Sequence, residues 1–380
     1  MLGTFGVWTR GTLQSRALPF ARALTNSAGL DVAIITTPWD APHAAGQYEE
    51  VDGVRIFNTP HHSPAKAPLA AAEQLRIVRE LRPRIIHLMK PKGFGGLAAA
   101  ARGLLPRGSR LVVDSDDWEG DGGWNDAGDY SLLARRLFAR QETRLIRSAD
   151  AVTAASTLLD ERARRLRRGR RDSRVVFLPN GLDASWLRAL GAARAPERPG
   201  PPSVLLYSRF AEFSPDWLRR FVARLDRDAA GPLRLEFVGE FDPATLAGLE
   251  LQNLTLHSHG YVERARIPGI LAGARVAVFP YEDTLINRAK QSVKLLELMA
   301  SGRPIVACDV GDIARIAGDA VDIAPSTEPA AVVGRVLALL ASDARRRELG
   351  ERARSRSAEF TIDRLAPRLL AAYRDTGHVA

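Results

Sequence analysis

The segment that most constrains the fold is 276–311, because strand and helix patterns alternate along it. It opens with an apolar run at 276–279, which has the length of a buried strand and leads into a polar loop. Apolar residues then recur at helical spacing over 293–299, and Gly302 and Pro304 stop that helix before a second apolar run. Strand, loop, helix and strand in this order predict a parallel sheet of the α/β class.

The start of the helix in this segment is a candidate phosphate site. Ser292 is a suitable N-cap, and unpaired amides at Ser292 and Val293 would attract an anion. Lys290 and Lys294 would lie one turn apart beside them and supply positive charge to a phosphate. Glu297, one turn further along, suits a pair of sugar hydroxyls. The periodicity by itself also describes an ordinary crossover helix with a solvated Lys–Glu pair.

A second candidate site is the segment 111–123, LVVDSDDWEGDGG. An apolar strand pattern ends there in a dense group of carboxylates next to glycines: Asp114, Asp116, Asp117 and Glu119. Carboxylates so close together repel one another and need cations, hydroxyl donors or water nearby. Three interpretations stay open: Asp116 and Asp117 orient sugar hydroxyls or an acceptor, an Asp-x-Asp pair binds Mg²⁺, or the segment is a solvated acidic loop.

Several segments together resemble one known family. KLLELMASGRPIVACDVG at 294–311 is similar to the donor-site segment of the group 1 (family-four) retaining glycosyltransferases, which have the GT-B fold. Similar positions recur as ADAVTAAS at 149–156, PNGLD at 179–183 and HGYV at 259–262. The matching residues of the donor-site segment are Glu297, Met299, Ala300, Gly302, Pro304 and Ile305. The resemblance implies an α/β architecture of two Rossmann-like domains that face each other across a cleft, in an enzyme of bacterial type.

The length of 380 residues agrees with two domains, because a single core rarely organises so long a chain. We expect an N-terminal Rossmann-like acceptor domain at 1–190 and a C-terminal nucleotide-sugar donor domain at 200–359. A stretch rich in Ala, Pro and Gly lies between them and indicates a linker. The amphipathic pattern near the C-terminus resembles a helix, 360–380, that packs back on the first domain.

The resemblance also implies roles for particular residues. Arg209, after the first strand of the second domain, would grip the donor diphosphate together with Lys294, and Lys290 would assist. The Glu297 carboxylate would hold the ribose, and Gly260-Tyr261 would lie near the base. The glycine loop after the first strand supplies the candidates Gly6 and Arg10, with Gly11 and Arg16 beside them.

The chain departs from the family pattern at three positions. The family often has a second Glu eight positions before the helix Glu, where this chain has Ala289. The family lysine that follows the diphosphate-binding Arg is Ser214 here. Asp116 stands where many members have a His attributed to the catalytic face, and Asp117 follows it. Lys290 and Lys294 would then replace the missing lysine.

The implied function is transfer of a hexose from a UDP- or GDP-sugar, with retention of anomeric configuration and with no obligatory cofactor or metal. Members of the family are thought to let the departing phosphate guide the incoming hydroxyl, so that a protein base is not needed. The acceptor, whether a glycan, lipid or small molecule, stays open. The alternatives are a non-catalytic GT-B-like protein that binds sugar nucleotides or acts as a scaffold, and a sugar-nucleotide epimerase on the same fold.

Composition narrows the partners. The chain is 46% hydrophobic and has no run of about 18 apolar residues, so we expect no membrane-spanning helix. Its single cysteine, Cys308, can form no internal disulfide, which fits the cytoplasm. The net charge of +10 either reflects an arginine-rich composition alone or indicates an anionic partner, such as a sugar nucleotide or acidic lipid headgroups. We interpret the arginine-rich run 162–174 as a helix end and an exposed loop, a candidate for peripheral contact with the inner face of an acidic membrane. Because that run lacks interleaved aromatic residues, we expect no nucleic-acid partner.

Overall fold

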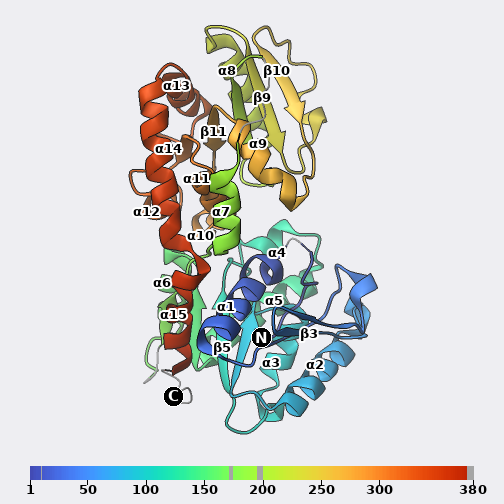
Figure 1. Ribbon diagram of the computed structural model, residues 1–380. Coiled ribbons are helices and arrows are strands. Elements are labelled where there is room, and N and C mark those ends of the chain that lie inside the picture. The colour runs from blue at the N-terminus through green and yellow to red at the C-terminus, as the bar shows by residue number, and fades with distance from the viewer. Residues whose placement is uncertain (10, 171–173, 195–199, 375–380) are drawn as a thin grey trace. The chain divides into compact units, whose positions relative to one another are not determined.

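The protein is described by a computed structural model that covers residues 1–380 except 10, 171–173, 195–199 and 375–380 (Figure 1). The chain divides into two compact units. Unit 1 comprises Met1–Gly181, Ala289–Gln291 and the described residues from Ile362 onwards, and unit 2 comprises Leu182–Arg288 and Ser292–Thr361. Both units are α/β, as the alternating sequence pattern predicts.

Unit 2 contains a parallel sheet of six strands in the order β10-β9-β8-β11-β12-β13. Counted along the chain, this is the order 3-2-1-4-5-6 of a doubly wound dinucleotide-binding sheet. The strands are β8 (Ser203–Tyr207), β9 (Leu233–Val238), β10 (Leu254–Ser258), β11 (Val276–Phe279), β12 (Ile305–Cys308) and β13 (Asp322–Ala324). The central strands β8, β11 and β12 are buried throughout, as expected of strands that helices cover on both faces.

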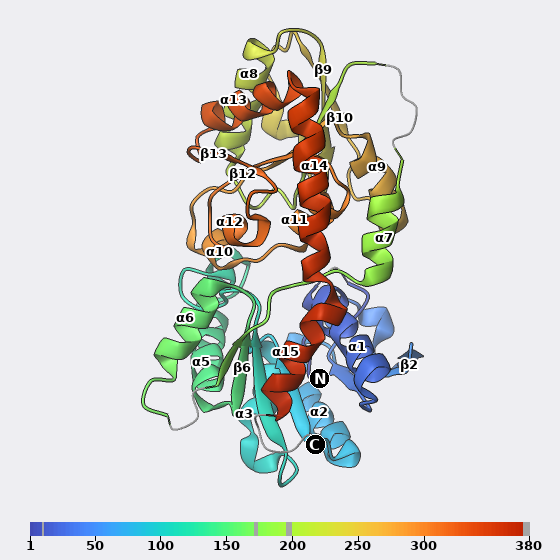
Figure 2. The same cartoon turned by 60° about the vertical axis from the view of Figure 1, so that its left-hand side comes forward.

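The helices of this half of the chain are α7 (Ala184–Ala192), α8 (Pro215–Asp228), α9 (Ile267–Gly273), α10 (Leu285–Ala289), α11 (Val293–Ala300), α12 (Ile313–Ala317), α13 (Pro329–Leu340) and α14 (Asp343–Ser357). Of these helices, α13 packs against strands β11, β12 and β13, whereas α14 packs against other helices. The long helix α14 runs beside α11 (Figure 2). Gly350 permits this approach, because a Cβ atom there would clash with the carbonyl oxygen of Gly302.

Unit 1 contains the parallel strands β4 (Ile85–Met89), β5 (Arg110–Ser115), β6 (Ala151–Ala154) and β7 (Val175–Phe177). A second group is β1 (Ala33–Thr36), which pairs in parallel with β3 (Val54–Asn58), which in turn pairs antiparallel with β2 (Tyr48–Val51). Leu2 forms parallel bridges to both Ile35 and Leu88 and so links β1 to β4. The two groups of strands therefore adjoin through Leu2. Because Leu2, β4 and β5 run parallel, the carboxyl ends of β4 and β5 and the chain after Leu2 lie at the same edge.

The helices of unit 1 are α1 (Leu18–Ala28), α2 (Ala67–Leu81), α3 (Gly93–Ala100), α4 (Trp124–Ala127), α5 (Leu132–Ser148), α6 (Thr157–Leu166) and α15 (Ile362–Arg374). The C-terminal helix α15 lies against α1 (Figure 2). Its apolar face, which includes Leu365, Leu369 and Tyr373, enters the same core as Leu18 of α1. Unit 1 is therefore completed by a segment that follows unit 2 in the sequence.

The sequence pattern also predicts one strand over 51–57, a loop over all of 281–291 and a strand over 1–5, and the structure differs from each of these three predictions. Residues 51–57 are not one strand, because Asp52 and Gly53 both have positive φ angles and form the tight turn between β2 and β3. Residues 281–291 are not all loop, since α10 lies within them. The first residues of the chain form only a single-residue bridge at Leu2 rather than a full strand.

Candidate active site

The centre of the unit 2 site lies at the carboxyl ends of β8 and β11, where the strand order reverses. Doubly wound sheets bind ligands at this switch point, because the loops leaving adjacent strands run to opposite faces there. Tyr207 is the last residue of β8, and Ser208 and Arg209 follow it. Helix α11 begins near this edge, after the loop that leaves β11.

Glu297 of α11 is held by two aromatic side chains. The indole Nε1 of Trp186 donates to its Oε1 at 2.8 Å, and the hydroxyl of Tyr207 donates to its Oε2 at 2.8 Å. The Glu297 side chain is almost fully buried, and burial together with the neighbouring Glu297 carboxylate raises the pKa of Tyr207 well above its usual value. Each carboxylate oxygen can accept more than one hydrogen bond, so both can still accept a ligand hydroxyl.

Two cations lie over the same two aromatic rings. The guanidinium carbon of Arg264 is 4.5 Å from the ring centre of Trp186, and Lys294 Nζ is 5.1 Å from the ring centre of Tyr207. Contacts at these distances are attractive because the face of an aromatic ring carries negative potential. Glu297, Tyr207, Trp186, Arg264 and Lys294 therefore form one assembly, which we call the donor cluster, with an acceptor flanked by positive charge.

The N-terminus of α11 is formed by Ser292 and Val293. Ser292 occupies the N-cap position, as the sequence predicts, but its hydroxyl makes no capping hydrogen bond. The first amides of the helix are therefore not satisfied by this side chain, and they keep the donor character that attracts anions at helix N-termini. Lys294 lies in the first turn of the same helix.

The loop after β8 is closed by Glu212. Its Oε2 accepts from the hydroxyl of Ser208 at 2.6 Å and from the amides of Arg209 and Ala211 at 3.2 Å each. Glu212 is buried, whereas the Arg209 side chain is exposed. The loop therefore presents the Arg209 side chain rather than its backbone amide to a ligand.

Ser214 caps helix α8, which explains the residue found where the family has lysine. Its hydroxyl accepts from the amide of Trp217 at 3.1 Å and donates to Glu282 Oε1 at 3.2 Å. The Ser214 amide also donates to the Glu282 carboxylate. This position thus carries a helix cap beside an acid, instead of a second cation.

Lys290 and Ala289 are grouped with unit 1, not with the donor cluster. Because α11 begins at Val293, the expectation that Lys290 and Lys294 stand one turn apart on one helix is wrong. Lys290 Nζ lies 6.0 Å from the ring centre of Trp124. Ala289 is fully buried in an apolar cluster of unit 1, so a carboxylate at that position would lose its hydration among apolar neighbours.

The HGYV turn lies beyond β10 in unit 2. Gly260 has a φ of 60°, which favours glycine, and its carbonyl accepts from the amide of Gly239 at 3.0 Å. Tyr261 follows it with 58% of its surface exposed. An exposed aromatic ring on a constrained turn can stack on a planar ligand.

In unit 1 the acidic segment is organised around Lys90. Its Nζ lies 2.6 Å from Asp117 Oδ2, 2.8 Å from Glu119 Oε1 and 3.7 Å from Asp116 Oδ2. Lys90 is buried and has a φ of 66°, an unusual angle for a residue with a side chain. The backbone after β4 is therefore bent so that this ammonium group lies among three carboxylates.

Two further cations complete this group, which we call the acidic cluster. Lys92 pairs with Glu119 and donates to Asn125 Oδ1 at 3.2 Å. Burial alone would raise the pKa of Glu119, but Lys90 and Lys92 lower it to about 2. Arg16 binds Asp114 through two hydrogen bonds of 2.7 and 2.8 Å.

These contacts decide one of the open interpretations. Asp114, Asp116 and Glu119 are all buried, so the description of this segment as a solvated acidic loop is wrong. Within the described residues no group of three or more His, Cys, Asp or Glu is arranged to hold a metal ion. The charge of the acidic cluster is balanced by Arg16, Lys90 and Lys92.

Asp116 is the least satisfied carboxylate of this cluster. Its Oδ2 accepts from the hydroxyl of Thr12 at 2.6 Å, whereas its buried Oδ1 has no hydrogen-bond partner among the described residues. Burial, with the charges of Asp117 and Asp114, raises the pKa of Asp116 to about 7 despite Lys90. A buried oxygen without a partner marks a position where a ligand hydroxyl would be stabilised.

The glycine loop after Leu2 is tied to Asp40. The Gly6 amide donates to Asp40 Oδ1 and the Thr9 hydroxyl to Oδ2, both at 2.6 Å. A Cβ atom at Gly6 would lie 2.8 Å from that of Ala41, which explains the glycine by close packing. Arg10 lies outside the described residues. The Gly6 amide is thus already engaged within unit 1.

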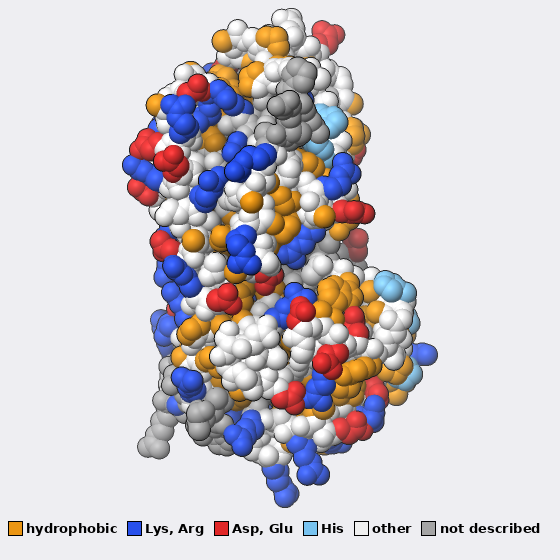
Figure 3. All heavy atoms as spheres, in the orientation of Figure 1, with side chains coloured by type: hydrophobic (Ala, Val, Ile, Leu, Met, Phe, Trp, Pro, Cys, Tyr) orange, Lys and Arg blue, Asp and Glu red, His pale blue; other side chains and the backbone are white. Residues whose placement is uncertain are grey.

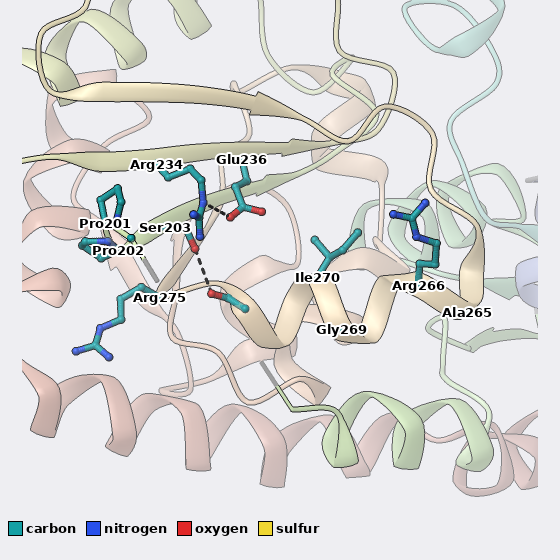
Figure 4. Close-up of a pocket in the computed structure, with 12 residues that line it drawn as sticks. Pro201, Pro202, Ser203, Arg234, Glu236, Ala265, Arg266, Gly269, Ile270 and Arg275 are labelled. Atoms are coloured by element: carbon teal, nitrogen blue, oxygen red, sulfur yellow. Dashed lines mark hydrogen bonds and ion pairs between the residues drawn. The ribbon is translucent and has the colours of Figure 1, made fainter. Parts of the chain in front are cut away.

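A pocket of unit 2 lies elsewhere, at the amino ends of β8 and β9 (Figure 4). Ser203 at its wall donates to the carbonyl of Gly273 at 3.1 Å, and Arg234 donates to Glu236 at 2.8 Å. Since ligands of doubly wound sheets bind at the carboxyl ends of strands, this pocket does not form part of the donor cluster.

Sequence reasoning missed three members of the donor cluster, Trp186, Tyr207 and Arg264. The signal for Tyr207 was present, because a polar aromatic residue ended a strand directly before Ser208-Arg209. Trp186 belongs to α7, which was not predicted, and Arg264 follows an exposed turn. Neither Trp186 nor Arg264 lies in a sequence motif that would mark it as a site residue.

The comparisons with known proteins agree with this architecture. Residues 11–181 match a family model described as a glycosyl transferase 4-like domain, and residues 201–342 match one described as glycosyl transferases group 1. No curated protein matches the chain.

Solved structures match over the full length at low identity, which shows the fold. They include sucrose-phosphate synthase from Thermosynechococcus elongatus (18% identity, TM-score 0.71, 100% of this chain and 99% of that chain). The trehalose-6-phosphate synthase OtsA matches with 10% identity and a TM-score of 0.72 over 100% of this chain and 99% of that chain. HepE of Anabaena, solved in complex with UDP, matches with 14% identity and a TM-score of 0.61 over 98% of this chain and 99% of that chain. With both halves matched, the chain belongs to the group 1 glycosyltransferases and has the GT-B fold.

Proposed function

We propose that this glycosyltransferase moves a hexose from a UDP- or GDP-sugar to an acceptor with retention of anomeric configuration. The observation that carries the proposal is the placement of Glu297 between Trp186 and Tyr207 at the carboxyl end of β8. A carboxylate held in this way is fixed in position and can accept two hydroxyls at once. The ribose of a nucleotide offers such a pair of hydroxyls.

The donor diphosphate would be bound by positive charge on the same edge of unit 2. Arg209 and Lys294 are the candidates from side chains, and Ser292-Val293 supply amides at the N-terminus of α11. These groups would stabilise the charge that develops on the departing diphosphate, which is the main electrostatic demand of the reaction. UDP in the HepE structure supports a nucleotide ligand for this fold.

No obligatory metal is part of the proposal, because cationic side chains can neutralise the diphosphate. Retention would follow if the leaving phosphate guides the incoming hydroxyl on the same face of the sugar. Gly260 and Tyr261 would contact the base, and Lys290 would assist in binding the diphosphate.

In unit 1 the proposed sugar or acceptor contact is Asp116 Oδ1. This oxygen is buried and has no hydrogen-bond partner among the described residues, while Thr12 and Lys90 fix the other oxygen of the same carboxylate. Asp117 is held 2.6 Å from Lys90 and would help to orient the group. Gly6 and Arg10 belong to the loop that would border this position.

A non-catalytic role as a sugar-nucleotide-binding or scaffolding protein is the second candidate. Ser214 and its partner Glu282 favour it, because a helix cap and an acid replace an expected cation. Ala289 likewise leaves the donor sugar without the second carboxylate that the family often has. Both candidates share nucleotide binding and differ only in turnover.

A cytoplasmic location and contact with an acidic membrane surface are also proposals. The buried thiol of Cys308, whose pKa is raised by burial to about 11, is the form expected in a reducing compartment. Among the described residues, no helix is both long and apolar enough to cross a bilayer.

The test is turnover on a panel of UDP-, GDP- and ADP-sugars with EDTA present, followed by release of the nucleoside diphosphate. The proposal predicts release with a UDP- or GDP-hexose and, by NMR of the product, the anomeric configuration of the donor. Nucleotide binding without release would identify the scaffold. If the protein neither binds the nucleotide sugars nor releases a nucleoside diphosphate, both candidate functions are contradicted.

A further inference from the structure

One face of helix α5 combines exposed leucines with exposed arginines. At about 100° per residue, the positions 132, 133, 136, 137, 140, 144 and 147 fall within an arc of about 140°. The opposite side of the helix faces the core of unit 1, where Gln141, Glu142, Leu145 and Ile146 are buried. The buried side fixes the orientation of α5, so the arc must face outward.

The N-terminal part of this arc is apolar. Leu132 is 73% exposed, Leu133 is 79% exposed and Leu137 is 43% exposed. Single exposed leucines are common on protein surfaces, but Leu133 and Leu137 are i,i+4 neighbours, and Leu132 lies at the other margin of the same arc. Exposed leucine side chains are unfavourable in water, and free energy is gained when a membrane or a partner molecule covers them.

The rest of the arc is basic. Arg136, Arg140, Arg144 and Arg147 are all exposed, and no acidic side chain in the described part of the chain pairs with any of them. At about 1.5 Å per residue they span about 16 Å along α5. On the face of the molecule drawn in Figure 3, by contrast, basic and acidic side chains are interspersed. The α5 arc is therefore a local concentration of positive charge.

A cavity of about 850 Å³ runs beside the arc. The four arginines form one wall, and Arg162 and Arg170 lie on its other side. The Arg162 guanidinium stacks 4.2 Å from the ring centre of Trp118, which also lines the cavity. Trp118 directly follows Asp117, so one lining residue adjoins the acidic cluster in the sequence.

Only part of the arginine-rich run 162–174 is exposed basic surface. Arg167 is fully buried and donates to the carbonyls of Ile146 and Ala149, at 2.8 Å each. Arg164 pairs with Asp160, and residues 171–173 lie outside the described part. Arg165, Arg168 and Arg170 of the same run are exposed, so α5 and this run both contribute exposed positive charge.

We propose that the α5 face docks on the surface of a bilayer that contains anionic lipids. Arginines would contact lipid phosphates while the three leucines enter the boundary between headgroups and acyl chains, as in helices that lie in a membrane interface. This pairing of charge with exposed leucine is what favours a bilayer over nucleic acid. A strand-binding groove would present aromatic rings for base stacking, and Trp118 is already covered by Arg162.

The test is flotation of the full-length protein with vesicles of phosphatidylcholine, either alone or with phosphatidylglycerol. The wild-type protein should bind the vesicles that contain phosphatidylglycerol and should lose this binding at high salt. It should not bind the vesicles of phosphatidylcholine alone. Arg140→Glu/Arg144→Glu and Leu132→Gln/Leu133→Gln should each weaken binding by at least about tenfold. These positions lie outside the donor cluster, so hydrolysis of a soluble nucleotide sugar should be unchanged.

Matched controls distinguish an effect of the α5 face from a general effect of positive charge or of exposed apolar surface. Arg107→Glu/Arg347→Glu changes the same charge at exposed sites elsewhere, and Leu69→Gln/Leu104→Gln replaces leucines that are 52% and 50% exposed. Both control variants should bind like wild type, with all melting temperatures checked.

Three results would overturn the proposal: no binding of wild type to anionic vesicles, equal loss in the variants and their controls, or loss of RNA binding rather than vesicle binding in the α5 variants. Self-association that only the leucine variant abolishes would assign the face to a second copy of the chain.

Discussion

The hydroxyl of Tyr207 donates a 2.8 Å hydrogen bond to the carboxylate of Glu297, which joins the end of the first strand of unit 2 to the middle of helix α11. The bond fixes an acid at the switch point of the sheet, where ligands bind. Trp186 holds the second oxygen, so the acid has one orientation rather than several. The function proposed for unit 2 rests on this fixed hydrogen-bond acceptor and on the cations around it.

The Tyr207→Phe variant tests how far that orientation matters. It removes one donor and little volume, so the folded protein should lose about 1 kcal/mol of unfolding free energy. Affinity for UDP or GDP should fall only a few-fold, because Trp186 still holds Glu297. Chemical denaturation and nucleotide titration measure the two effects. A Tyr207→Phe variant with unchanged stability would show that the hydrogen bond contributes nothing net.

Lys294→Ala should raise the nucleoside diphosphate dissociation constant at least about tenfold, equivalent to about 1.4 kcal/mol. The same change should affect a nucleoside monophosphate less, because the ammonium group is proposed to contact the diphosphate. Arg347→Ala is the matched control, since Arg347 is an exposed cation on α14 of the same unit. Equal losses for both nucleotides would place Lys294 away from the diphosphate.

Arg209→Ala and Arg209→Lys separate charge from geometry on the loop after β8. Alanine should weaken binding of the diphosphate about tenfold, and lysine should restore only part of it, because it lacks the two-pronged donor of a guanidinium. Isothermal titration with UDP and GDP measures both. Full recovery by lysine would show that only the net charge at Arg209 counts.

Asp116 predicts a pH dependence of stability. Its pKa is raised to about 7 mainly by burial, from 3.8 in an unfolded chain. Between these values the native state holds a proton that the unfolded state has lost, so the contribution of Asp116 to stability falls as the pH rises from about 4 to 7. Asp116→Asn should remove this decline and be more stable than wild type at pH 8. A parallel pH profile for the two proteins would contradict the assignment.

Asp116→Asn should nevertheless lower turnover, if Oδ1 contacts the sugar or acceptor. Transfer or hydrolysis should drop by about tenfold or more with nucleotide affinity unchanged, because the acid lies in unit 1. Asp31→Asn, at an exposed acid of the same unit, is the control. Lower nucleotide affinity in Asp116→Asn would place this residue in the donor site instead.

The contribution of Glu119 to stability depends on pH in the opposite direction. Its pKa is lowered to about 2, so its stabilising contribution is complete above its unfolded pKa of about 4 and is lost as the pH falls from there to 2. Glu119→Gln should be destabilised by roughly 3 kcal/mol or more at pH 7, since it removes a partner of both Lys90 and Lys92. Thermal melts from pH 2 to 8 test this. An unchanged melting temperature at neutral pH would contradict the account.

Much of the fold follows from periodicity, because long apolar runs leave few options. The apolar runs of the sequence predict strands over 203–207, 233–238, 276–279 and 305–308, and strands β8, β9, β11 and β12 have these bounds. The pattern failed where a turn interrupts a run, as at Asp52-Gly53, and where a short helix such as α10 lies in a polar stretch. Helix α7 was missed because it adjoins a segment of linker composition.

The candidate sites were harder to predict, since they depend on contacts between distant residues. Glu297 was marked by a motif, but its partners Trp186 and Tyr207 lie 111 and 90 positions away. The burial of Asp116 likewise depends on Thr12, 104 positions earlier. Local sequence carries no information about such pairs. Lys90 and Lys92 were visible as lysines at a strand end, yet their role as counter-ions required the fold.

The most direct test of the donor site is isothermal titration of wild type and Glu297→Ala with UDP and GDP. The account predicts that wild type binds at least one of them and that Glu297→Ala, with its fold confirmed by circular dichroism, binds at least about tenfold more weakly. Equal affinity of the two proteins would contradict the assignment of Glu297 as the acid that holds the ribose.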